Sequence, residues 1–323
     1  MNKKIIIAIV AVVLVLAIGL SLFFILRKPA APETLKLGLG VVVSADASSA
    51  TADANGKGEA EITVAAVLVD KDGKIVKAYI DVMSLALEYT TAGEAVANTE
   101  FKSKQELGDA YGMKDAPYGS AKEWYEHAEI FCNAVVGKSV AEIAGVGSSS
   151  ELTAAGCTIY VGDFVKAVEK AVNNAKASNA TAENALKVGM SVEQTTTNAT
   201  ADKAGSNAAD TTIVAVAMNG ETVVAASSDV VSVSFGFTTA GVSTFDKTAE
   251  IKTKHELGDA YGMKDAPYGS AKEWYDHANA FDAACAGKTV AQIAGLEGNA
   301  DLIAAGCTIS IDGFIAAVGN LQD

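Results

Sequence analysis

The sequence predicts an α+β protein with an N-terminal transmembrane helix followed by two tandem repeats, each an antiparallel sheet with packed helices. Three observations lead to this fold class: an apolar run near the N-terminus, a duplication offset by about 150 residues, and β-branched segments followed by helical patterns in each copy. The predicted parts are a membrane anchor, a short linker, a first repeat, a second linker and a second repeat, over residues 1–28, 29–34, 35–176, 177–185 and 186–323.

The apolar run Ile5–Leu26 has the length of a membrane-spanning helix. Its 22 residues, at about 1.5 Å each, extend about 33 Å, enough to cross a hydrocarbon core of roughly 30 Å. Signal peptides have a shorter apolar region and a small-residue cleavage site, so we expect this segment to remain as an anchor. The short N-terminus normally stays inside. We therefore expect a single-pass protein of the cell membrane with both repeats extracytoplasmic.

The expected extracytoplasmic part is strongly acidic. Without the four basic residues that flank the apolar run, 21 Lys and Arg face 39 Asp and Glu, a formal charge of −18. Such a field disfavours nucleic acid and anionic lipid surfaces as partners. The membrane contact is therefore expected through the N-terminal helix alone.

The duplication is visible in matched segments such as Ala155–Thr158 and Ala305–Thr308. Each copy has the size of a domain, and the offset is far too long for a solenoid or propeller repeat. The copies have diverged except in one block of twenty identical residues, Glu106–Tyr125 and Glu256–Tyr275, which we call the invariant block. Two alternatives explain this identity, local constraint on the block or recent homogenisation between the copies.

The first half of each repeat predicts strands. In copy one, Leu35–Val43 is followed by a polar stretch, Ser44–Gly58, that is typical of a loop. An Asp-Gly turn at 70–73 separates two β-branched runs, the signature of a hairpin, and the second copy has an Asn-Gly turn there. The further predicted strands are Glu61–Val69, Lys74–Met83, Leu85–Tyr89, Thr212–Met218, Thr222–Ala226 and Val230–Phe237.

The second half predicts helices. Ser120–Glu123 has the pattern of a capping box and predicts a helix that runs to about Val136. Further capping boxes at Ser139–Glu142 and Thr289–Gln292 each predict a short helix. A last amphipathic helix is expected over Asp163–Ala177 and Gly313–Leu321.

The four cysteines fall two in each repeat. Cys157 and Cys307 are equivalent. Cys132 aligns with Asp282 and Cys285 with Val135, so the two cysteines take positions three apart on the same face of the predicted helix. An oxidising exterior favours one disulfide in each repeat, Cys132 with Cys157 and Cys285 with Cys307. The alternative is four small buried thiols.

Both copies carry a Gly-x-Thr turn ahead of the last helix, within Ala155-Gly156-Cys157-Thr158 and Ala305-Gly306-Cys307-Thr308. An upstream acidic residue, this turn and an amphipathic helix resemble the flavinylation motif of the FMN-binding domain family. That family includes subunits of sodium-pumping quinone reductase and related electron-transport complexes, and surface proteins of extracellular electron transfer. Its motif has Ser and Ala where this chain has Ala and Cys, and its Asp lies one position closer to the Thr.

The resemblance implies FMN attached through its phosphate to Thr158 and Thr308 by a separate flavin transferase. Gly156, Thr158, Gly306 and Thr308 are the matching residues. Four aromatic residues of the invariant block would lie near the flavin, namely Tyr111, Trp124, Tyr261 and Trp274. A structural interpretation is also open, in which Gly permits a tight turn, Thr caps it and Cys lies in the core.

The invariant block can line a groove for a ligand, because Tyr and Trp offer amphipathic contact area and its glycines admit a close backbone approach. Alternatively, Trp124 anchors a helix on the sheet and the glycines shape a loop. Glu123 and His127, four apart, can approach one cation, but two ligands do not make a metal site, and a solvated helix face is the other interpretation. His255 has no counterpart in copy one and is expected at the surface.

No nucleophile elbow, phosphate-binding loop or zinc-protease motif occurs, and the chain holds three histidines in all. We therefore expect a carrier or binding protein rather than a catalyst, with no catalytic or metal-binding residues. One hypothesis is a membrane-anchored flavoprotein that takes electrons from a membrane donor. The alternative is a non-enzymatic cell-surface module that binds a ligand or partner through two equivalent sites and gains avidity.

Overall fold

The computed structural model describes residues 32–114, 119–264 and 269–322. Thr34–Asp323 forms one compact unit that contains both repeats. The predicted anchor over residues 1–28 lies outside the described residues. In the part of the chain that is described, no helix has the length and apolarity needed to cross a membrane.

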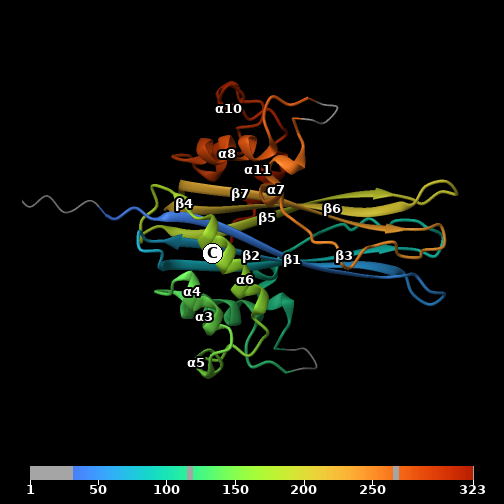
Figure 1. The fold of residues 1–323 in the computed structure, drawn as a ribbon, viewed down its shortest axis with the longest axis horizontal. Coiled ribbons are helices and arrows are strands. Elements are labelled where there is room, and N and C mark those ends of the chain that lie inside the picture. The colour runs from blue at the N-terminus through green and yellow to red at the C-terminus, as the bar shows by residue number, and fades with distance from the viewer. Residues whose placement is uncertain (1–31, 115–118, 265–268, 323) are drawn as a thin grey trace, which may run out of the picture. The chain divides into compact units, whose positions relative to one another are not determined.

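Each repeat contributes one antiparallel sheet, so the α+β class is confirmed (Figure 1). The first sheet has the order β3-β2-β1-β4, with β1 (Lys36–Ser48), β2 (Gly56–Val69), β3 (Ile75–Tyr89) and the two-residue β4 (Lys176–Ala177). The second has the order β5-β6-β7, with β5 (Ala185–Thr197), β6 (Gly205–Asn219) and β7 (Thr222–Phe237). The expected linker between the repeats therefore begins as a strand that pairs with β1.

The strands are longer than the sequence pattern indicated. The stretch Ser44–Gly58, expected as a loop, is strand at both ends, and Ala45 pairs with Ala60. Strands β3 and β7 also run through the breaks expected at residue 84 and at 227–229. The reason is that ladder hydrogen bonds to a neighbouring strand hold the backbone whatever the side chains, so context overrides local strand propensity.

The two hairpin turns are confirmed. Asp70 Oδ1 accepts hydrogen bonds from the N–H groups of Asp72 and Lys74, at 2.9 and 2.8 Å. Gly73 and Gly220 have φ values of 78° and 57°, which L-residues with a side chain adopt rarely.

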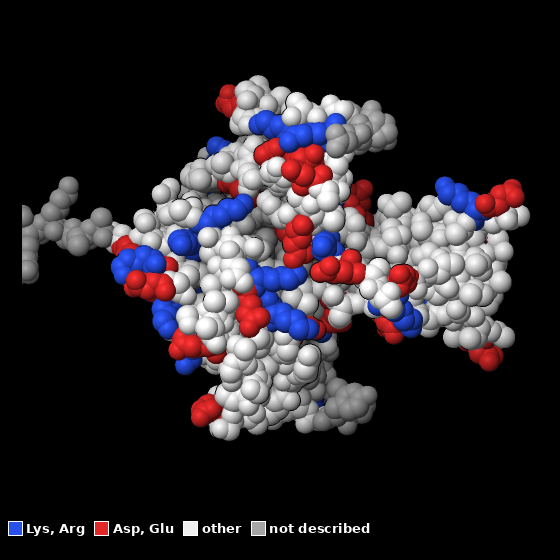
Figure 2. Space-filling view, in the orientation of Figure 1, with Lys and Arg blue, Asp and Glu red and all other residues white. Residues whose placement is uncertain are grey.

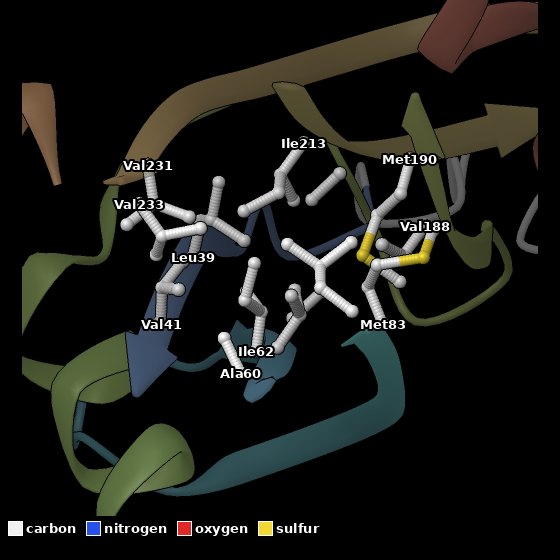
Figure 3. Packing of buried hydrophobic residues seen from close by; sticks show 14 of the residues in the cluster. Leu39, Val41, Ala60, Ile62, Met83, Val188, Met190, Ile213, Val231 and Val233 are labelled. Atoms are coloured by element: carbon white, nitrogen blue, oxygen red, sulfur yellow. The ribbon is translucent and has the colours of Figure 1, made fainter. Parts of the chain in front are cut away.

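The two sheets pack face to face and share one core. Leu39, Val41, Ala60, Ile62 and Met83 of the first sheet point toward side chains of the second, among them Val188, Met190, Ile213, Val231 and Val233 (Figure 3). At one end of this core the rings of Tyr89 and Phe237 stack at 4.5 Å. Because the core takes side chains from both repeats, removing either repeat would expose the inner face of the other.

Each sheet also buries its outer face, beneath the helices of its own repeat (Figure 1). Alternate residues of β2 show this, since Ile62, Val64 and Ala66 face the other sheet while Ala65 and Val67 face the helices. The result is four layers, helices, sheet, sheet and helices. This two-sided burial explains why β2 has a continuous apolar run.

The helices of repeat 1 are α2 (Lys104–Leu107), the 3-10 helix η1 (Gly108–Tyr111), α3 (Trp124–Val135), α4 (Val140–Val146), α5 (Ser150–Ala154) and α6 (Gly162–Asn174). Their counterparts in repeat 2 are α7 (Lys254–Leu257), η2 (Gly258–Tyr261), α8 (Trp274–Cys285), α9 (Val290–Ile293), α10 (Ala300–Ala305) and α11 (Asp312–Gly319). The last helices lie close against the sheets because Gly38 and Gly189 have no Cβ, and one added there would overlap the carbonyl oxygens of Ala171 and Ala317.

The predicted helix starts at Ser139 and Thr289 are confirmed, whereas the one at Ser120 is wrong. Helix α3 begins at Trp124 with Glu123 as its N-cap, and the N–H of Glu123 donates to the Glu126 carboxylate at 2.7 Å. Ser120 is occupied elsewhere, since its hydroxyl donates to the carbonyl of Lys122 at 2.7 Å. A local hydrogen bond of this kind competes with a helix cap.

All four cysteines are free thiols in the structure, so the predicted disulfide pairs are not formed there. Cys157, Cys285 and Cys307 are buried, and burial raises the pKa of the Cys132 thiol to about 12. These side chains act as small apolar residues of the outer cores.

Candidate functional site

The Gly-x-Thr turn has the same geometry in both repeats. Gly156 and Gly306 follow α5 and α10 with φ values of 102° and 106°, where any other residue would be strained. The N–H groups of Cys157 and Cys307 donate to carbonyl oxygens in the preceding helix, each at 3.1 Å, and both thiols are buried. The side chains of Thr158 and Thr308 are exposed.

A buried histidine two residues after the invariant block holds each turn. The N–H of Thr158 donates to His127 Nδ1 at 3.4 Å, and that of Thr308 donates to His277 Nδ1 at 3.1 Å. Both histidines are 1% exposed. The sequence indicated His127 beside a cation or on a solvated helix face, and the structure shows instead that it is buried and supports the turn.

The tautomer of this histidine follows from its partners. Because Nδ1 accepts an N–H, the ring proton of the neutral imidazole is on Nε2, which lies 3.0 Å from Ser120 Oγ, or 3.1 Å from Ser270 Oγ in repeat 2. The serine oxygen therefore receives this proton. A serine that accepts from its histidine is not activated as a nucleophile. Burial lowers the pKa of His127, which keeps the ring neutral.

Glu123 and Glu273 hold the loop that precedes each helix. The Glu123 carboxylate accepts from the N–H groups of Met113 and Lys114 at 2.8 and 3.2 Å, and Glu273 makes the same contacts at 2.9 and 3.3 Å. The two carboxylates are nearly inaccessible, so the expectation of a solvated face is wrong for Glu123. Over the described ranges no cluster of three His, Cys, Asp or Glu has the arrangement of a metal site.

A lysine of the invariant block lies over each turn. A Cβ added to Gly156 would come within 2.8 Å of Lys122 Cε, and one added to Gly306 would overlap the Lys272 ammonium. Lys272 Nζ also lies 3.4 Å from the carbonyl oxygen of Ala305. Neither lysine forms an ion pair with a residue that the structure describes.

The four aromatic residues expected near the flavin differ in how deeply they are buried. Trp124 and Trp274 are 4% and 3% exposed and pack against phenylalanines of the last helices, Phe164 and Phe314. Their indoles fill the outer cores, and almost no indole surface is open to a ligand. Tyr111 is half-buried and Tyr261 is 36% exposed.

A second lysine pair ties these aromatic residues together. Lys104 Nζ lies 5.4 Å from the ring centre of Tyr111 and 5.7 Å from that of Trp124. Lys254 repeats the arrangement in the other copy, at 5.3 and 5.7 Å. These cation–π contacts hold α2 and α7, the short helices at the start of the invariant block, against its aromatic residues.

His255, expected at the surface, is half-buried. Its ring packs edge-on against Trp274 at 5.4 Å, and burial lowers its pKa to about 4. It stands in the place of Gln105 in repeat 1, whose side chain donates to the carbonyl of Ile80. Both residues directly precede the invariant block.

Sequence reasoning did not identify the contacts among Ser120, Lys122, His127 and the turn. The only signal for them was the identity of the block that holds the serine and the lysine, because the contacts with the turn join residues 31 to 34 positions apart. Hydrogen bonds across such separations leave no periodic pattern in a sequence.

The comparisons with known proteins reach only part of the chain. No family model matches it, and no solved structure matches it significantly. A segment of 95 residues is 38% identical to a protein named chlorophenol reductase from Desulfitobacterium hafniense. This match covers 25% of the chain and 29% of the length of that protein, and the likeness is confined to that segment.

Proposed function

We propose that this chain is a membrane-anchored, extracytoplasmic flavin carrier in which the FMN phosphate is esterified to the threonine of a Gly-x-Thr turn. One observation carries the proposal, namely an exposed threonine hydroxyl on a backbone that a buried histidine fixes, beside a lysine with no ion-pair partner among the described residues. The partial similarity to a protein named a reductase agrees with a redox setting.

The attachment needs an activated flavin phosphate, and we assign this role to a flavin dinucleotide brought by a separate transferase. The threonine Oγ attacks the flavin-side phosphorus, the P–O–P anhydride bond breaks, and adenosine monophosphate leaves. The hydroxyl proton passes to the transferase or to water, and no electrons are exchanged. The turn has to supply only an accessible hydroxyl, which Thr158 and Thr308 both have.

The lysine beside the turn can neutralise the charge of the phosphate. A phosphodiester carries one negative charge, and the protein around it is acidic overall. On the face shown in Figure 2, acidic and basic side chains are interspersed and no broad positive patch is formed. A phosphate on the turn therefore depends on local partners. The Lys272 ammonium lies at its turn and is in place to neutralise it, and Lys122 is the equivalent residue of repeat 1.

In this function the flavin supplies the redox chemistry, and the protein binds and orients it. A membrane electron donor would reduce the flavin, which then passes electrons to an acceptor outside. His127 and His277 use Nδ1 to hold the turns, so in the described site neither imidazole is free to act as a general base. The chain is thus proposed as a carrier.

The test is co-expression of the full chain with a flavin transferase, followed by an absorbance scan and an intact mass after denaturation. The expected protein is yellow and heavier by FMN. The double variant Thr158→Ala, Thr308→Ala should be colourless, while Thr153→Ala, an exposed threonine on the neighbouring helix, should remain yellow. An unmodified mass in the parent chain would reject the proposal and leave the two-site binding module as the better account.

A further inference from the structure

The two threonine turns differ in what lies beside them. In repeat 2 a cavity of about 290 Å³ opens against the turn, and Thr308 itself is one of its walls. Its other walls are mostly aliphatic, with a few polar groups that include Glu297, Asn299 and Ser310. An apolar hollow with few polar groups is the usual form of a small-molecule site.

The cavity beside α5 in repeat 1 is placed differently. A cavity of about 340 Å³ lies between α4 and α5 and is bordered by Ala134, Lys138 and Ala155, and Thr158 is not among its walls. Where repeat 2 has Ser310, repeat 1 has Tyr160, whose hydroxyl lies against Gly162 at the start of α6. Tyr160 is 79% exposed, so this large side chain projects into solvent from the segment that follows Thr158.

One glycine difference explains the change of shape. A Cβ added to Gly147 would come within 2.7 Å of Val165 Cγ2, so a side chain there would collide with α6. Repeat 2 has Glu297 at this position, and its carboxylate accepts from the N–H of Ile311 at 3.2 Å. Helix α9 ends at Ile293, whereas α4 continues to Val146. The chain of repeat 2 therefore leaves the helix earlier, and the cavity lies in the space this opens.

Lys122 and Lys272 also differ in a way that favours a phosphate at the turn of repeat 2. In repeat 2 the Lys272 ammonium itself reaches the turn, 3.4 Å from the carbonyl oxygen of Ala305. In repeat 1 the nearest part of Lys122 to Gly156 is its carbon chain. The positive charge is thus placed at the turn that also has the cavity.

We propose that the two turns are not equivalent, and that repeat 2 alone seats a flavin, with phosphate on Thr308, Lys272 beside the phosphate and part of the ring system in the adjoining cavity. This inference rests on the proposed function. It makes repeat 1 a structural partner that completes the shared core. One carrier chain then holds one flavin, and electron transfer between two flavins of the same chain does not occur.

The first test is peptide mapping of the full chain after co-expression with a flavin transferase. The expected result is one FMN per chain on the peptide that contains Thr308. Thr308→Ala should lose the flavin and Thr158→Ala should keep it. Two FMN groups, or one on the Thr158 peptide, would overturn the inference and leave the proposed function intact. An unmodified mass would overturn both.

The second test addresses the cavity. Ser310→Tyr introduces the residue of repeat 1, and Tyr160→Ser is the matched control. Because a pocket buries most of a ligand's surface, Ser310→Tyr should raise iodide quenching of the flavin fluorescence at least about threefold, and the control should not change it. Equal quenching in the parent chain and in Ser310→Tyr would show that the ring lies outside the cavity and would overturn this assignment.

Discussion

The invariant block makes the same contacts in both repeats, while the segment from α4 to the start of α6 differs from its counterpart in repeat 2. The serine–histidine distances are 3.0 and 3.1 Å, and the glutamate contacts of the block agree to within 0.1 Å. By contrast, α4 has seven residues and α9 has four. The comparison teaches that the block and the histidine that follows it support the turn, whereas the variable segment decides what can lie against the turn.

The shared core shows a second difference between the repeats. Phe235 covers Gly58, where any side chain would overlap the ring. The position of Gly58 is taken in repeat 2 by Asn207, which is fully buried and donates to the carbonyl oxygens of Glu88 and Val96 at 2.9 and 3.0 Å. The two inner faces are therefore complementary to each other and are not interchangeable.

The largest effect is expected where the repeats are alike. Gly38→Val or Gly189→Val would force the last helix of the respective repeat away from its sheet, because the new Cβ overlaps a backbone carbonyl. We expect each to cost about 3 kcal/mol or more of the free energy of unfolding, as overpacking against backbone does. Urea denaturation followed by circular dichroism measures it.

A matched control exists within α4. Nothing lies within 4 Å of a Cβ added to Gly145, so Gly145→Ala should be neutral or stabilising by about 0.5–1 kcal/mol. If only one of the two valine variants is strongly destabilised, the close helix approach is needed in one repeat and not in the other.

The sequence was sufficient for the α+β class, the two hairpins and two of the helix starts, because period, Asp-Gly and Asn-Gly turns and capping boxes are local signals. It did not predict that the sheets share a core. The residues that build this core are apolar on both faces of β2, and a two-sided strand gives no sign of which face meets which partner.

Of the candidate site, the sequence predicted the turn but not its support. Gly156 and Thr158 stood out through their resemblance to a motif, whereas His127 gave no hint that it contacts Thr158. Trp124 drew attention as an aromatic residue in an invariant block, and the structure places it in a core. Burial cannot be read from residue type when Trp is common both in cores and in binding sites.

The next effect concerns the support of the turns. His127→Leu and His277→Leu remove both hydrogen bonds of a buried imidazole and leave the threonine N–H without its acceptor. We expect a loss of roughly 2–3 kcal/mol in each case, since the contacts are the same. Hydrogen exchange at Thr158 or Thr308 should speed up in the mutated repeat alone. Faster exchange in both repeats would mean that the turns are coupled through the shared core.

A pH dependence should separate the repeats. Burial raises the pKa of Asp81 to about 7 and that of Asp229 to about 6, so the native state binds these protons more tightly than the unfolded chain. Their stabilisation is full at low pH and is lost as the pH rises toward the native pKa. Between pH 5 and 8 we expect a loss on the order of 2 kcal/mol from Asp81 and about half from Asp229.

Asparagine variants test this assignment. Asp81 Oδ1 accepts from the N–H groups of Val82 and Gln105, at 2.7 and 3.1 Å, and an amide oxygen can take the same bonds. Asp81→Asn should therefore flatten the pH profile of stability more than Asp229→Asn does. An unchanged profile in both variants would place the pH dependence in other groups.

The smallest effect is expected at an exposed ion pair that only repeat 1 has. Lys74 and the capping residue Glu142 approach to 2.6 Å, and this hydrogen bond, with those from Ser139, lowers the pKa of Glu142 to about 2. Repeat 2 has Gln292 in this position. The stabilisation from Glu142 is present at neutral pH and is lost as the pH falls from about 4.5 toward 2. Salt should weaken it because both partners are exposed.

Glu142→Gln makes the two caps alike, so it should change the stability at pH 7 little. NMR titration of the parent chain should find the Glu142 carboxyl still ionised at pH 3. A normal Glu142 pKa at low salt would show that the pair with Lys74 does not persist in solution.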